Sequence, residues 1–187
     1  MNLLKTYYEY MQEPAYAVHQ LLKRRSFTQA CWGYFAAALG LVLFFNIGNG
    51  ISIGAFLFKL LVLFCAALTT GYLLAAMCSL FLDLNKVHAS PAELFVLFGT
   101  AGFINGVLIA LALISAILPL AHLGCLAPLA LLLVFALQIG YLTRGIMRAY
   151  DVPAGTVLVA WIFSVVPLML AVFLLGVFFI WGIVLLF

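Results

Sequence analysis

Charged residues are nearly absent from the long apolar runs that fill this chain from Phe27 to Phe187. Only one of these runs holds a lysine well inside its bounds, Lys59. An apolar run of about 20 residues is long enough to cross the hydrocarbon core of a bilayer as an α-helix. The chain is 68% hydrophobic and 7% charged, whereas a soluble domain carries about 25% charged residues. We therefore predict an all-α, polytopic membrane protein, a bundle of transmembrane helices.

Turn signals and polar connections divide the apolar part of the chain, residues 27–187, into five predicted spans. Their approximate bounds are 27–45, 51–82, 93–118, 126–148 and 156–187. The second and fifth runs exceed what a straight crossing needs. We expect the second run to start along the interface and to cross from about Leu60. Pro167 should kink the fifth, because proline removes a backbone donor and clashes one turn back.

Residues 1–26 form an N-terminal segment of polar and aromatic residues. Within it, Pro14 starts a stretch in which Ala15, Val18 and Leu21 recur at helical spacing. This pattern predicts an amphipathic helix that lies in the headgroup plane or packs on the spans. The segment lacks the apolar core of a secretory signal peptide.

The positions of the basic residues predict the orientation of the spans. If five spans alternate, all the lysines and arginines outside the apolar runs fall on one side of the membrane: Lys5, Lys23, Arg24, Arg25, Lys86, Arg144 and Arg148. An excess of basic residues marks the cytoplasmic side. We therefore expect a cytoplasmic N-terminus and a C-terminus on the periplasmic or outer side.

Composition and motifs argue against several classes of function. The net charge of +3 is too small, and its distribution too scattered, to predict a nucleic-acid partner. Signature motifs of metalloproteases, nucleotide-binding loops and serine hydrolases are missing. The three histidines fall in separate segments, and the four cysteines lack zinc-like spacing. We predict no catalytic residue, no metal site, no cofactor and no enzymatic activity.

The third span carries a pattern typical of close helix packing. Gly99, Gly102 and Gly106 recur along it, so that Gly102 and Gly106 form a GxxxG motif, with Asn105 between them. Small residues at this spacing let two helix backbones approach closely. We expect this span at the centre of the protein, facing Gly33, Ala37 and Gly40 of the first span.

Two polar side chains within the spans are candidate contacts for a lipid or substrate, Lys59 and Gln138. An ionised side chain within a membrane is a functional candidate by default. Alternatively, Lys59 reaches the headgroups along its aliphatic stem, and Gln138 hydrogen-bonds a neighbouring helix, because an unpaired amide in lipid is unfavourable.

The predicted cytoplasmic end gathers most of the remaining charge. Arg144 and Arg148 lie one helical turn apart. Acidic and basic residues of the adjoining connections should lie at the same level: Asp83, Lys86, Glu93 and Asp151. These six residues form a candidate docking surface for a partner protein or for anionic headgroups. Alternatively, they anchor the spans at the membrane surface.

Several stretches resemble the Yip domain family, the Ypt- or Rab-interacting integral membrane proteins, in its compact prokaryotic form. They are the lead-in at 13–16 (Glu-Pro-Ala-Tyr), the Leu-Leu-Lys-Arg-Arg stretch at 21–25, the short polar connection at 83–93 and the turn at 141–154. The resemblance implies five spans, a cytoplasmic N-terminus and a role in membrane organisation. It also implies a location in the bacterial inner membrane.

Two functions follow as hypotheses. The first is a Yip-like, non-enzymatic membrane organiser or adaptor that binds a partner through its basic cytoplasmic face. The alternative is a small transporter or lipid-handling membrane protein. Either would have membrane lipids as partners, together with a protein partner at the cytoplasmic face or further copies of the chain.

Overall fold

A computed structural model describes residues 26–46, 52–117 and 126–186 of the chain. These residues form helices and contain no strand. The helices are, in order, α3 (Phe27–Phe45), α4 (Ile53–Leu84), α5 (Pro91–Ala101), the 3-10 helix η1 (Gly102–Asn105), α6 (Gly106–Ile117), α7 (Leu126–Tyr150) and α8 (Ala154–Leu186). The amphipathic helix predicted near the N-terminus lies outside the described residues.

Five helices are long and apolar enough to cross a membrane, with α5, η1 and α6 together forming the third. Many large apolar side chains on α4, α7 and α8 are exposed, among them Phe58, Leu132 and Met169. Exposed apolar patches of this extent are rare on soluble monomers. The predictions of an all-helical protein and of five membrane-spanning helices are therefore confirmed.

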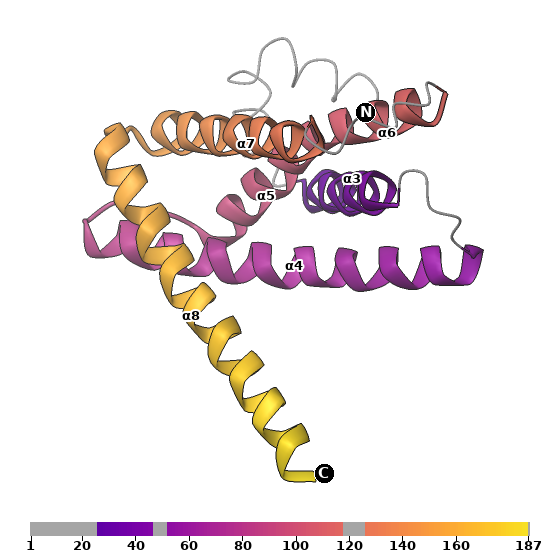
Figure 1. Ribbon diagram of the computed structural model, residues 1–187. Helices are drawn as coiled ribbons and strands as arrows, with labels where there is room; N and C mark the ends of the chain where they lie inside the picture. The colour runs from indigo at the N-terminus through magenta and orange to yellow at the C-terminus, as the bar shows by residue number, and fades with distance from the viewer. Residues whose placement is uncertain (1–25, 47–51, 118–125, 187) are drawn as a thin grey trace.

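The charged connections meet at one end of the bundle, which we call the basic end because Lys86, Arg144 and Arg148 lie there. The end of α4, the start of α5, the end of α7 and the start of α8 all reach it, at the left of Figure 1. A hydrogen bond of 3.3 Å from the Tyr150 hydroxyl to the Glu93 carboxylate joins α7 to α5 there.

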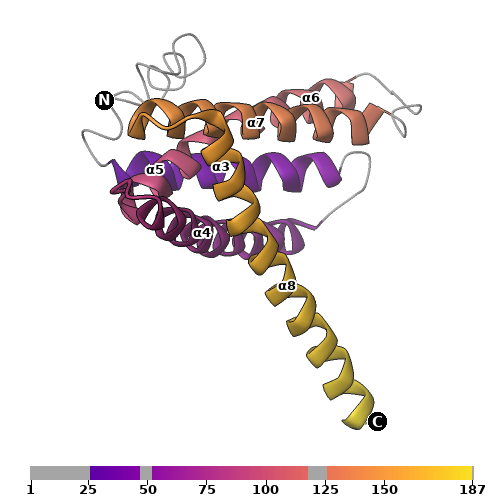
Figure 2. The same ribbon diagram turned by 90° about the vertical axis from the view of Figure 1, so that its left-hand side faces the viewer.

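The two long helices are each continuous. α4 has 32 residues without a break at Leu60, and the expectation that its first residues lie along the interface stays a prediction. Its length of roughly 48 Å exceeds a hydrocarbon core of about 30 Å. α8 continues as one helix through Pro167. It starts beside α7, runs obliquely across α4 and extends away from the other helices (Figures 1 and 2). A steep tilt is one way in which an overlong helix crosses a bilayer.

The third span is the most buried of the five and is also the one that is interrupted. In an 18-residue apolar window of this span 67% of the residues are buried, whereas none is buried in the corresponding window of α4. A single continuous helix was expected, but four residues, Gly102–Asn105, adopt the tighter 3-10 form. Such a stretch within a helix is typical of a locally constrained site.

Candidate functional site

α3 packs against the third span almost backbone to backbone. A Cβ atom added to Gly33 would collide with the carbonyl oxygen of Gly99, and one added to Gly102 would lie 2.5 Å from the Gly33 carbonyl oxygen. Gly40 is equally tight, since its added Cβ would lie 2.6 Å from the Asn105 carbonyl oxygen. Gly99 is tight as well, since its added Cβ would lie 2.7 Å from the Ala30 carbonyl oxygen. Four glycines therefore allow this approach, while Gly106 is only half-buried.

Tyr34 fills the space where α3, α4 and α5 meet. Its hydroxyl donates a hydrogen bond of 3.2 Å to the carbonyl oxygen of Phe95. Its ring lies against Gly71 of α4, where a Cβ atom would overlap the tyrosine. The side chain is almost fully buried, so its aromatic ring and its polar tip are both accommodated by the bundle.

Asn105 and Gln138 form the polar contact between the third span and α7. The Asn105 amide nitrogen lies 3.3 Å from the Gln138 side-chain oxygen and 3.3 Å from the Gly102 carbonyl oxygen. Asn105 is buried and sits within the interruption of the third span. The structure thus places Gln138 in contact with a neighbouring helix, where the amides provide each other with a partner.

Lys59 lies at the end opposite the basic end, beside Asn46, the C-cap residue of α3. Its ammonium donates a hydrogen bond of 2.9 Å to the Asn46 side-chain oxygen. The Asn46 amide nitrogen in turn bonds the Val42 carbonyl oxygen at 2.6 Å. Both polar side chains line a shallow cavity of about 250 Å³ whose other walls are apolar. Lys59 is exposed, so its ammonium can reach the membrane surface along its stem.

The acidic residues at the basic end take part in local structure. Asp83 accepts a hydrogen bond of 3.3 Å from the backbone N–H of Ala89. Glu93 accepts one from Tyr150, as described above. Asp151 lies directly after α7 with φ = 51°, where it allows the Val152 N–H to bond the Met147 carbonyl oxygen and close the helix end.

The basic residues at this end are exposed and are not neutralised by those carboxylates. Arg144, Arg148 and Lys86 all have exposed side chains. Within the described residues, neither arginine forms an ion pair. Lys86 occupies the left-handed region at φ = 64° and closes the end of α4 in the way that Asp151 closes α7. The six residues predicted as a docking surface therefore do lie at one end, with the carboxylates of Asp83 and Glu93 hydrogen-bonded locally and Asp151, Lys86 and the two arginines exposed.

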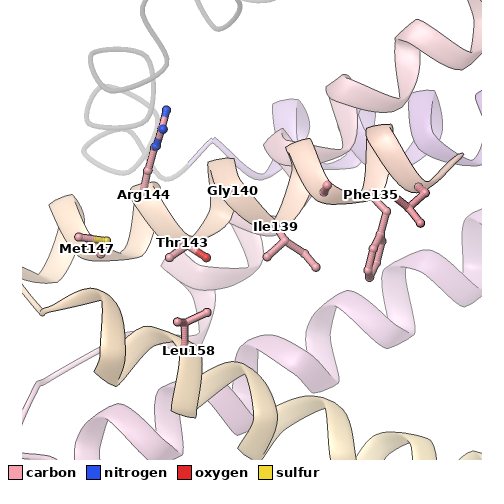
Figure 3. Close-up of a pocket in the computed structure, with 9 residues that line it drawn as sticks. Phe135, Ile139, Gly140, Thr143, Arg144, Met147 and Leu158 are labelled. Carbon is pink, nitrogen blue, oxygen red and sulfur yellow. The ribbon is translucent and has the colours of Figure 1, made fainter. Parts of the chain in front are cut away.

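A groove runs along the outer face of α7 (Figure 3), and we call it the α7 groove. It has a volume of about 660 Å³. Most of its lining comes from α7, namely Leu132, Phe135, Ala136, Ile139, Gly140 and Thr143. Arg144 and Met147 line its end near the basic end, and Leu158 of α8 forms the opposite wall. Spacings of three and four residues place these α7 side chains on one helical stripe.

Two polar atoms of α7 and α8 are buried without a hydrogen-bond partner among the described residues, the Thr143 hydroxyl and the Trp161 indole nitrogen. The Trp161 ring stacks on Phe98 with centroids 5.3 Å apart, so its packing is satisfied although its donor is not. Each unpaired buried group is unfavourable by about 1–3 kcal/mol. The α7–α8 side of the bundle is thus less completely matched than the α3 side.

The described residues contain no cluster of histidine, cysteine, aspartate or glutamate that could hold a metal ion. Within the same part of the chain, Asp83 and Glu93 each contact a backbone or tyrosine donor, and His88 is exposed.

Comparison of the chain with protein-family models, with curated proteins and with solved structures yields no match. The resemblance to the Yip domain family therefore stays a prediction.

Sequence reasoning did not single out Tyr34, Asn46 or Gly140 as parts of a site. Asn46 had a detectable signal, since a side chain that ends one helix can reach a lysine early in the next. Gly140 had none, because a glycine in an apolar run looks the same whether it contacts a helix or faces open space.

Proposed function

We propose that the protein is a non-enzymatic membrane organiser or adaptor of the Yip type, which docks an acidic partner protein on its basic end. The basic end faces the cytoplasm, in accord with the positive-inside rule. The membrane is the bacterial inner membrane, as the resemblance to compact prokaryotic Yip proteins implies.

One observation carries this proposal: two of the carboxylates at the basic end are engaged locally, whereas its two arginines are not. Asp83 and Glu93 accept hydrogen bonds from their own surroundings, whereas Arg144 and Arg148 are exposed and form no ion pair in the described part of the chain. Unneutralised, exposed arginines attract acidic surfaces and steer their approach. If these residues only anchored the spans at the membrane surface, the Asp83 and Glu93 carboxylates would not need to be engaged away from the arginines.

Charge reversal tests the docking surface. Arg148→Glu combined with Lys86→Glu should reduce the amount of partner protein that co-purifies in mild detergent by about tenfold or more. The reason is that like charges across an interface repel each other. Lys59→Glu makes the same kind of charge change at the opposite end and serves as the matched control. The proposal fails if the control loses the partner equally, or if no partner with an acidic contact surface depends on Arg148 and Lys86.

Orientation is tested separately. A tag at the N-terminus should be protected from an impermeant reagent in sealed cells, and a tag at the C-terminus should be accessible. Two tags with equal accessibility would contradict a cytoplasmic basic end with five crossings.

A second candidate function, lipid handling, is favoured by the α7 groove, which is open, apolar and bordered by Arg144. A pocket of about 660 Å³ falls within the range of small-molecule sites.

A further inference from the structure

The α7 groove has the dimensions of one lipid chain. From Arg144 to Leu132 it follows twelve residues of α7, a rise of roughly 18 Å at 1.5 Å per residue. One leaflet of the hydrocarbon core is about 15 Å deep, half of about 30 Å. The groove therefore starts at the level of the basic end and reaches the middle of a bilayer.

The polarity of the residues that line the groove changes once along this length. The walls from Leu132 to Gly140 are apolar, and charge enters only with Arg144. In Figure 3 the Ile139 and Phe135 side chains lie on the face of α7 toward α8, while the Arg144 guanidinium extends from the groove margin on the side away from α8. An elongated, open apolar groove with one cation at its outer margin matches an amphiphile with an anionic head.

Small residues keep the groove open. Ala136 and Gly140 lie in the middle of its stripe, and a Cβ atom added to Gly140 would have no heavy atom within 4 Å. Elsewhere in the bundle, the space beside the glycines of α3 and the third span is occupied by the backbone of a neighbouring helix. Gly140 therefore has space beside it that no part of the described chain occupies.

We propose that the α7 groove binds one anionic phospholipid, with an acyl chain along the stripe of Leu132, Ala136 and Gly140 and the phosphate on Arg144. A guanidinium suits this role because it can donate two parallel hydrogen bonds to phosphate oxygens. Arg144 has no carboxylate partner within the described residues, so its charge is available. This site shares Arg144 with the protein-docking surface but not Arg148 or Lys86, which do not line the groove, so the two sites can be tested separately.

Native mass spectrometry of the full-length protein tests this inference, with dioleoyl phosphatidylglycerol and dioleoyl phosphatidylcholine as probes. The two lipids share their acyl chains and differ in net headgroup charge. We expect one phosphatidylglycerol to bind about tenfold more tightly than phosphatidylcholine, because the quaternary ammonium of choline offsets the phosphate charge and repels the Arg144 guanidinium. Equal binding of both lipids would overturn the proposal.

Two variants separate the groove from the charge. Gly140→Phe should fill the groove and reduce binding of both lipids about tenfold, whereas Arg144→Gln should remove the preference for phosphatidylglycerol and leave the weak binding of phosphatidylcholine. Gly54→Phe is the matched control, because Gly54 on α4 also has nothing within 4 Å of an added Cβ, and it should leave both affinities unchanged.

Other outcomes assign the groove differently. Retention of full phosphatidylglycerol binding by Gly140→Phe would exclude the groove. If Gly140→Phe dissociates an oligomer and leaves lipid binding unchanged, a second copy of the chain occupies the groove and the lipid proposal is wrong. The charge-reversed variant Arg148→Glu/Lys86→Glu should keep the bound lipid, so loss of the protein partner and loss of the lipid are distinguishable.

Discussion

The α3 side and the α7–α8 side of this bundle use small residues in opposite ways. On the α3 side, the backbone of a neighbouring helix occupies the space beside Gly33 and Gly102. On the α7–α8 side, Gly140 faces open space within a groove. Since lipid tails are as apolar as leucine, helix association in membranes depends on close packing rather than on apolar burial. The first side therefore stabilises the bundle, while the second leaves room for a molecule from outside it.

Polar groups follow the same division. Between the third span and α7, Asn105 and Gln138 satisfy each other inside the bundle. Toward the outer face, the Thr143 hydroxyl is unpaired among the described residues and Arg144 is exposed. A paired amide specifies how two helices meet, whereas an unneutralised cation is available to a partner or a lipid.

The largest contrast is expected from Gly33→Val. Its Cβ would collide with the Gly99 carbonyl, and backbone on both sides cannot move away as a flexible side chain can. We expect a loss of about 3 kcal/mol or more in the free energy of unfolding, at the upper end of overpacking effects. Equilibrium unfolding in mixed detergent micelles measures it. Stability like that of the unsubstituted protein would show that α3 does not pack as described.

A double-mutant cycle tests the Asn105–Gln138 contact. Asn105→Leu or Gln138→Leu alone should lower the free energy of unfolding by about 1–2 kcal/mol, because each removes the hydrogen bond between the two amides. The double substitution should be less destabilising than the sum of the two. Simple additivity would show that the two amides do not interact.

Removal of a hydroxyl group should change the free energy of unfolding in opposite directions on the α3 side and on the α7–α8 side. Tyr34→Phe removes the bond to the Phe95 carbonyl and should destabilise by about 1 kcal/mol. Thr143→Val replaces an unpaired buried hydroxyl with a methyl group and should be neutral or stabilising by up to about 1 kcal/mol. Chemical unfolding of the two variants side by side provides the comparison, and destabilisation by both would contradict it.

The smallest effect is expected from Gly140→Ala. The added methyl group meets no atom within 4 Å, and alanine is favoured over glycine within a helix by about 0.5–1 kcal/mol. The variant should thus unfold at slightly higher denaturant, unlike any substitution at Gly33. Destabilisation would mean that the groove is narrower than the structure shows.

Much of the fold could be predicted because the relevant signals are local. The first span was predicted at 27–45 and α3 has those bounds, since Ser26 and Asn46 border an uninterrupted apolar run. The interruption at Gly102–Asn105 was not predicted, because the same residues are compatible with a continuous helix. Its position coincides with contacts to Gly33, Gly40 and Gln138, which belong to other parts of the chain.

The candidate sites divide along the same line. Arg144, Arg148 and Lys86 were predicted at one end, because alternation of the spans determines which connections meet. The engagement of Asp83 and Glu93 by Ala89 and Tyr150 depends on side-chain geometry, which sequence spacing does not specify. Nor did any pattern in α7 indicate a groove.

The sequence by itself determined that this is a helical membrane protein with five spans and a charged boundary at one end. Its reason is that the transfer of a segment into lipid depends on that segment's own length and polarity. Only the tertiary structure decided which glycines lie against a backbone and which lies beside a vacant groove. That distinction depends on which distant segments come into contact, and glycine carries no side chain that would record the difference.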